Sequence, residues 1–88
     1  MWKAHPDVIH TRAPRGGVLL DVRRKVYFSL NETGATLWKV LERGASEAEL
    51  VSALLDAYDT EELVARRDVE SLLGELEQAH LVERRGAG

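Results

Sequence analysis

The chain has 88 residues, of which 44% are hydrophobic and 31% charged, with a formal net charge of −3 and no cysteine. This length and composition predict a single globular domain, residues 1–88, with a core just large enough to fold. The absence of cysteine excludes disulfides and thiolate-based metal or redox chemistry. No apolar run approaches the roughly 20 residues that a membrane span needs, and the N-terminus lacks the apolar core of a signal peptide. We therefore expect a cytoplasmic protein that does not enter the membrane.

The net charge conceals an asymmetry along the chain. Residues 1–30 contain six Lys or Arg against two Asp, a net of +4, whereas residues 31–59 and 60–82 each sum to −4 and residues 83–88 to +1. A basic first third followed by acidic segments indicates mixed electrostatics, which suits a peptide partner and does not suggest a phosphate-binding protein.

Extended segments are predicted only in the first third of the chain. Residues 1–7 read as a frayed lead-in. β-branched and aromatic side chains predict strands at residues 8–12, 18–22 and 25–30, and Pro and Gly in residues 13–17 predict a turn.

The register of the second and third strands depends on the length of their connection. A three-residue loop, residues 23–25, matches the apolar faces of the two strands. It pairs Val18, Leu20 and Val22 with Leu30, Phe28 and Val26. A two-residue loop is commoner in hairpins but would turn one strand over, and neither loop has the Gly or Asn that such turns prefer. We favour the three-residue loop because it keeps the apolar faces together.

Three helices follow. The first runs from Asn31, a capping residue, to Arg43, with Gly44 after its last turn. The second begins at the capping box Ser46–Glu49 and ends near residues 58–59, and the third spans about residues 60–80. The apolar positions expected to face inward are Leu37, Trp38 and Leu41, then Leu50, Leu54, Leu55 and Ala57, then Ala65, Val69, Leu72, Leu73 and Leu76. Residues 81–82 form a short extended end before a polar tail, residues 83–88.

This order, βββααα, predicts an α+β fold: a winged-helix-like arrangement of a three-stranded antiparallel sheet packed with a three-helix bundle. The third predicted strand lies between the sheet and the helices. If it is also the last strand of the sheet, one of its edges is unpaired, and we expect the functional site there.

No catalytic or metal-binding pattern accompanies this fold. His5, His10 and His80 lie on three separate segments without a carboxylate at ligand spacing. The serines suggest no Ser-His-Asp arrangement, and Gly16-Gly17 is too short for a phosphate loop. We therefore expect no enzyme activity, no metal and no cofactor.

A winged-helix arrangement also suggests DNA binding, with the last helix in the major groove. That helix region, residues 60–82, carries two arginines against six carboxylates. A recognition helix with a net charge of −4 is repelled by phosphates, so we expect no nucleic-acid partner.

Two motifs carry a resemblance to a known family. Residues 26–38 read Val-Tyr-Phe-Ser-Leu-Asn-Glu-Thr-Gly-Ala-Thr-Leu-Trp, after the run Val18-Leu19-Leu20 and before Gly44, and residues 68–76 read Asp-Val-Glu-Ser-Leu-Leu-Gly-Glu-Leu. In order and spacing these resemble the PqqD-like family over about residues 8–83. Members of this family are RiPP recognition elements, which bind the leader segment of a ribosomally made precursor peptide and present it to modifying enzymes. The resemblance implies that a leader adds as an antiparallel strand to the third predicted strand, in a groove closed by the third helix.

The resemblance also indicates the candidate peptide-binding residues. The unpaired strand offers backbone N–H and C=O groups, and apolar pockets must supply specificity. Val26 and Phe28, with Leu72 and Leu76, are candidates to line such pockets, although all four are equally expected as ordinary core residues. The full candidate set is Val26, Tyr27, Phe28, Ser29, Leu30, Arg67, Asp68, Leu72, Glu75 and Leu76.

Within the family the chain is most similar to the stand-alone leader-binding half of a split lasso peptide B protein. The partners then implied are a precursor leader peptide, a cysteine-protease-type leader peptidase and an asparagine-synthetase-like macrocyclase. The alternative is the D protein of pyrroloquinoline quinone biosynthesis, which works with a radical SAM enzyme. The motifs do not separate the two.

Overall fold

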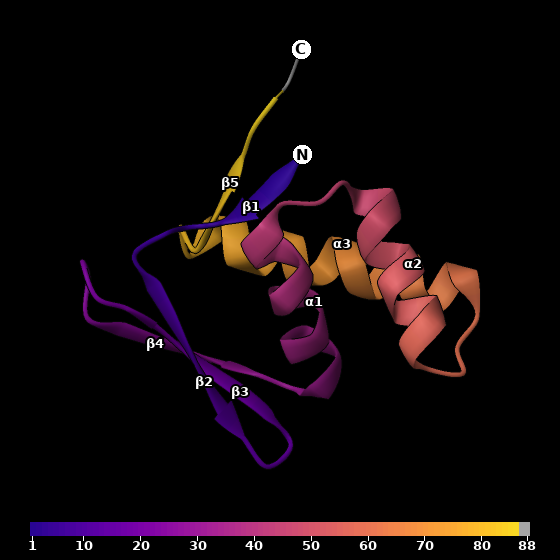
Figure 1. Cartoon of the computed structure of the whole chain (residues 1–88), viewed down its shortest axis with the longest axis horizontal. Helices are drawn as coiled ribbons and strands as arrows, with labels where there is room; N and C mark the ends of the chain where they lie inside the picture. Colours follow the sequence, from indigo (N-terminus) through magenta and orange to yellow (C-terminus); the bar gives the residue numbers. More distant parts are fainter. Residues whose placement is uncertain (87–88) are drawn as a thin grey trace.

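The computed structural model describes residues 1–86 and contains five strands and three helices in them (Figure 1). The elements are β1 (Trp2–Ala4), β2 (Val8–Ala13), β3 (Gly16–Asp21), β4 (Val26–Leu30), α1 (Glu32–Arg43), α2 (Glu47–Ala57), α3 (Glu62–Gln78) and β5 (Val82–Arg84). Strands β2, β3 and β4 form an antiparallel sheet in that order. The predicted α+β fold with βββ before ααα is therefore confirmed, and β1 and β5 add a second, two-stranded sheet.

Helix α1 forms the centre of the core. The Asn31 side chain caps its start by accepting the Gly34 N–H at 2.8 Å, and Gly44, at φ 88°, ends it. Leu37, Trp38 and Leu41 are at most 2% exposed. α1 packs against both β3 and α2, so its apolar stripe joins the sheet to the other helices.

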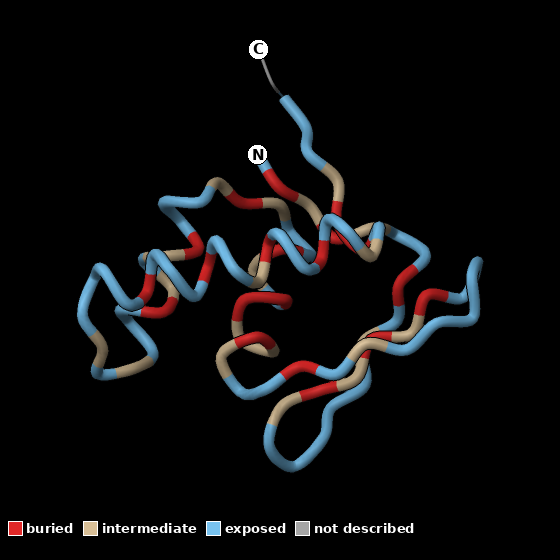
Figure 2. Tube along the Cα trace, turned by 180° about the vertical axis from the view of Figure 1, so that it is seen from behind, coloured by how far each residue is buried: buried red, intermediate tan, exposed pale blue. Residues whose placement is uncertain are grey.

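Helices α2 and α3 complete the bundle with a narrower apolar stripe than predicted. The capping box of Ser46 and Glu49 is present, with both reciprocal hydrogen bonds. Leu50 and Leu54 are buried, but the predictions for Leu55 and Ala57 are wrong because both side chains are exposed. At 100° per residue, Leu55 lies about 140° around the helix from Leu50 and so outside the buried stripe. Ala57 lies on the Leu50 face, but it is the last residue of α2, at the exposed end of the helix. Figure 2 shows the resulting alternation of buried and exposed positions along the helices.

The prediction of a frayed lead-in at residues 1–7 is wrong. β1 pairs antiparallel with β5, and Trp2 also exchanges backbone hydrogen bonds with Ala45, at 2.6 and 2.8 Å. Trp2 is only 7% exposed, and the Arg84 guanidinium lies 4.6 Å from the centre of its ring. The two ends of the chain therefore close the core together. Of the predicted polar tail, Ala87 and Gly88 lie outside the described residues.

The favoured strand register is also wrong. The β3–β4 connection has four residues, 22–25, and pairs Leu19 with Phe28 and Asp21 with Val26. Leu19 is fully buried, whereas Val18 and Leu20 lie on the other face of β3 and Val22 is 44% exposed. The expected register therefore differs from the observed one by one residue: Phe28 pairs with Leu19 and not with Leu20.

The chemistry of the turn explains this register. Asp21 is fully buried, and its carboxylate accepts the Arg23 backbone N–H and two guanidinium N–H groups at 2.9–3.1 Å. Its carbonyl oxygen accepts the Lys25 N–H at 2.7 Å, with Lys25 at φ 56°. A buried carboxylate needs such partners, so Asp21 determines which face of β3 turns inward.

We predict that Asp21→Asn lowers stability at neutral pH and flattens the acid side of the stability curve. The hydrogen bonds from the Arg23 side chain hold the pKa of Asp21 below its ordinary value of 3.8. A lowered folded-state pKa gives stability that is full above about pH 4 and is lost as the pH falls below it. Urea unfolding at neutral pH and at about pH 3 should show the wild-type advantage shrinking on acidification. An advantage that is independent of pH would contradict this role.

Candidate functional site

The outer edge of β4 is unprotected. β4 is the last strand of the β2–β3–β4 sheet, so within residues 1–86 only one of its edges is paired. Its sequence, Val-Tyr-Phe-Ser-Leu, contains no charge and no proline, the usual devices that keep an edge from pairing with other chains. Val26 is 47% exposed and Tyr27 71% exposed. An exposed, uncharged edge of this kind is suited to accept another extended chain.

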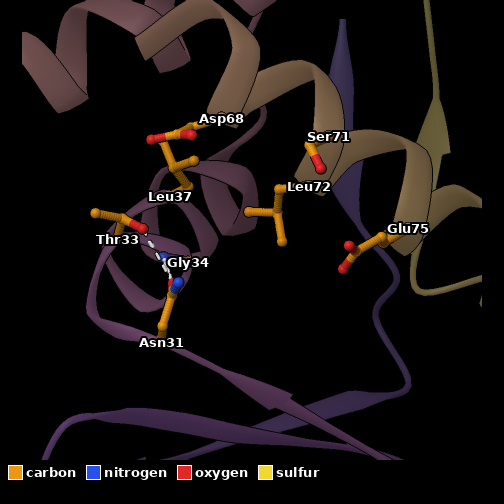
Figure 3. A pocket seen from close by; sticks show the side chains of 8 residues that line it. All are labelled: Asn31, Thr33, Gly34, Leu37, Asp68, Ser71, Leu72 and Glu75. Carbon is orange, nitrogen blue, oxygen red and sulfur yellow. Dashed lines mark hydrogen bonds between the residues drawn. The ribbon is translucent and has the colours of Figure 1, made fainter. Parts of the chain in front are cut away.

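A cavity of about 180 Å³ opens where β4 ends, between the start of α1 and α3 (Figure 3). Its lining residues are Asn31, Thr33, Gly34, Leu37, Asp68, Ser71, Leu72 and Glu75. Leu37 and Leu72 supply apolar surface, and the carboxylates of Asp68 and Glu75 extend from α3 (Figure 3). The cavity therefore suits an apolar side chain with a hydrogen-bond donor or a positive charge at its end.

The α1 side of this cavity is held by hydrogen bonds. The side-chain amide oxygen of Asn31, Oδ1, accepts both the Gly34 N–H at 2.8 Å and the Thr33 hydroxyl at 3.0 Å (Figure 3). Because that oxygen is used twice, the donors that Asn31 retains for a ligand are those of its amide NH₂ group.

Three of the ten site residues predicted from the sequence line this cavity, and the other seven lie elsewhere on β4 and α3. Asp68, Leu72 and Glu75 line the cavity, next to the end of β4. Phe28 is half-buried and packs on the core, and Ser29 is exposed on the strand. Leu30 and Leu76 are buried, so they support the strand and the helix from beneath, and Arg67 is exposed outside the cavity lining.

Sequence reasoning did not include five residues of the cavity lining: Asn31, Thr33, Gly34, Leu37 and Ser71. Asn31, Thr33 and Gly34 were predicted only as part of the capped start of α1, and Leu37 only as an inward-facing core residue. The signal that could have revealed them is the position of that cap, directly after an edge strand.

A second cavity, of about 340 Å³, lies between α2 and α3. Its α3 residues, Glu62, Arg66, Val69 and Glu70, occupy the helix face opposite to Asp68, Leu72 and Glu75. It therefore forms no part of the surface that continues from the β4 edge.

Within residues 1–86, no three His, Asp or Glu side chains lie close enough to hold a metal ion. Across the same residues no helix has the length and apolar character needed to cross a membrane.

Comparison with known proteins identifies the family. The profile of "Coenzyme PQQ synthesis protein D (PqqD)" matches residues 16–82, which include the whole β3–β4 hairpin and all three helices. The chain belongs to the PqqD family. The resemblance inferred from the two sequence motifs is thereby confirmed. No curated protein sequence matches the chain significantly.

Two solved structures are similar to this PqqD-family chain over nearly their whole length. One, "TbiB1 in Complex with the TbiA(beta) Leader Peptide", has a TM-score of 0.83 and 27% identity, and the match covers 96% of this chain and 98% of that one. The other, "Lasso peptide synthetase B1 complexed with the leader peptide", has a TM-score of 0.79 and 29% identity, with 94% and 98% covered. Both are complexes of a protein with a leader peptide.

We predict that Leu72→Ala lowers the free energy of unfolding clearly less than Leu73→Ala does, because Leu72 lines the cavity and Leu73 lies in the core. Leu73 is 3% exposed, so its truncation should cost about 2–5 kcal/mol of stability. Leu72 borders the cavity and is half-buried, so its truncation should cost clearly less. Urea denaturation of both variants measures the difference. Equal losses would place Leu72 in the core and remove it from the site.

Proposed function

We propose that this protein binds the leader segment of a ribosomally synthesised precursor peptide, of the lasso peptide type, by strand addition to β4. The observation that carries the proposal is the exposed, uncharged edge of β4 beside the cavity between α1 and α3. Membership of the PqqD family and the likeness to two leader-peptide complexes support it.

In the proposed complex the leader runs antiparallel to β4 and pairs with the backbone of Val26 through Leu30. Main-chain hydrogen bonds to an edge strand supply affinity that depends little on the leader's side chains. The free edge needs little rearrangement to bind, because β4 is already extended in the unbound chain.

Specificity in this proposal comes from the cavity and its rim. An apolar leader side chain enters between Leu37 and Leu72, and the carboxylates of Asp68 and Glu75 accept hydrogen bonds from its polar end or from a neighbouring residue. Arg67, exposed on α3, is the one predicted contact placed to meet an acidic group of the leader. Phe28, Leu30 and Leu76 act from beneath by keeping the strand and helix in place.

We further propose that the protein is not an enzyme but presents the bound precursor, in the cytoplasm, to enzymes that process it. These are a cysteine-protease-type leader peptidase and an asparagine-synthetase-like macrocyclase. The alternative is a peptide chaperone of pyrroloquinoline quinone biosynthesis, which works with a radical SAM enzyme. The description of the matching family favours this alternative, while both similar structures favour the lasso type. The genes encoded beside this one distinguish the two.

DNA binding through α3, the other function that a winged-helix arrangement suggests, is not favoured by the charge of this helix. Residues 60–82 carry a net charge of −4, and α3 itself contains five carboxylates against two arginines, which phosphates would repel.

The decisive test is an amide-shift titration with a synthetic leader peptide from the precursor encoded beside this gene. We expect saturable shifts concentrated in residues 25–30 and 66–76, and Leu72→Ala should weaken binding without unfolding the chain. A scrambled peptide of the same composition is the control. Shifts confined to residues 44–60, or no saturable binding, would overturn the proposal.

A second prediction concerns catalysis. The purified protein alone should neither cleave nor cyclise the precursor, because its proposed site contains binding groups and no nucleophile paired with a base. Mass spectrometry of precursor incubated with the protein measures this. Processed product in the absence of any partner enzyme would refute a purely binding role.

A further inference from the structure

The two walls of the proposed leader site belong to different packing units. β4 packs mainly on β3 and α1, whereas α3 packs mainly on α2 and β5. The cavity lies between α1 and α3 at the end of β4 that leads into Asn31 (Figure 3). At that end the chain runs from β4 directly into α1, whose Leu37 lines the cavity together with Leu72 of α3. At the other end, near Val26, a different connection is needed.

The β3–β4 turn provides it. The Arg24 Nη1 group donates to the Ala79 carbonyl oxygen at 2.9 Å, and the Arg23 Nη2 group donates to the His80 carbonyl oxygen at 3.1 Å. These carbonyls lie at the C-terminal end of a helix, where positive charge is favourable. α3 has no basic residue in its own last turn, so the arginines of the turn supply that charge.

Arg23 is itself fixed in place. Its guanidinium pairs with the fully buried carboxylate of Asp21 and lies 2.7 Å from His5 Nε2. A guanidinium held on a buried carboxylate loses little further freedom when it also binds a backbone carbonyl. The Asp21–Arg23 pair therefore holds the turn in one conformation, and the neighbouring Arg24 side chain extends from this turn to α3.

We propose that Arg23 and Arg24 form a clasp that sets the spacing between β4 and α3 and so positions both walls for the leader. This inference rests on the proposed function. An antiparallel leader has its C-terminal side beside Val26, so the clasp lies where the precursor leaves the site toward its modified part. Arg23 and Arg24 are positioning residues in this proposal and need not contact the leader.

Arg24→Ala is the direct test, because Arg24 is exposed and its loss leaves the Asp21–Arg23 pair intact. Arg24→Lys is the conservative variant, since one ammonium group can replace the single hydrogen bond to Ala79. Arg15→Ala is the matched control: Arg15 is an exposed arginine in the β2–β3 turn, at the other end of the sheet. Thermal unfolding shows that each variant is folded.

The first readout needs no leader. The chain contains no cysteine, so spin labels can be attached at Ser29→Cys on β4 and Gly74→Cys on α3. Ser29 is exposed, and a Cβ at Gly74 would meet nothing within 4 Å. We expect Arg24→Ala to lengthen or broaden the 29–74 distance distribution. Arg24→Lys and Arg15→Ala should leave it unchanged.

The second readout, made without labels, is affinity for the same synthetic leader peptide by calorimetry. We expect Arg24→Ala to weaken binding about three- to tenfold, which is the scale of one ordinary intramolecular hydrogen bond, with Arg24→Lys near wild type. An unchanged distance distribution overturns the clasp, and a changed distribution with unchanged affinity overturns its role in binding. If Arg24→Ala does not fold, Arg24→Gln is measured in its place. If the wild type does not bind the peptide, the proposed function fails and the distance measurement alone decides whether the clasp exists.

Discussion

The buried carboxylate of Asp21 is the constraint on which the sheet depends. Left without partners inside the domain, this charge would be strongly destabilising, so the chain must supply donors within reach. Arg23 supplies three of them from two residues away. The four-residue turn that results places Leu19 in the core opposite Phe28. The position of β4, and with it the edge proposed to bind a leader, follows from how this one charge is satisfied.

The edge of β4 differs from most exposed edges in having nothing that prevents pairing. Edge strands generally carry a charge, a proline or a bulge, because an open edge invites association with other chains. β4 has no charge and no proline, and Tyr27 is largely exposed. A function that requires an extended peptide at this edge gives a physical reason for leaving it open. In the proposed complex, the carboxylates on α3 beside this edge limit which peptides are accepted.

The proposed site is therefore assembled from parts that do not pack closely on each other. β4 is placed by the hairpin and α1, and α3 is placed by α2, β5 and the closure of the chain ends around Trp2. Such a site can change its width without disrupting either unit. We propose that the connections at its two ends, the capped start of α1 and the arginines of the β3–β4 turn, control this width and so matter for leader binding.

The helices, the order of the elements and the family were all readable from the sequence. Capping residues and helical periodicity are local signals, and Asn31, Ser46 and Leu37 show them within a few positions. The candidate wall residues Asp68, Leu72 and Glu75 came from the resemblance to the PqqD-like family, and helical periodicity had indicated only Leu72, as an inward-facing position. Three features required the tertiary structure. The pairing of β1 with β5 joins opposite ends of the chain, the register depends on which face of β3 packs against α1, and the cavity exists only between α1 and α3. Each depends on contacts between segments far apart in sequence, and such contacts leave no periodic pattern in the residues that make them.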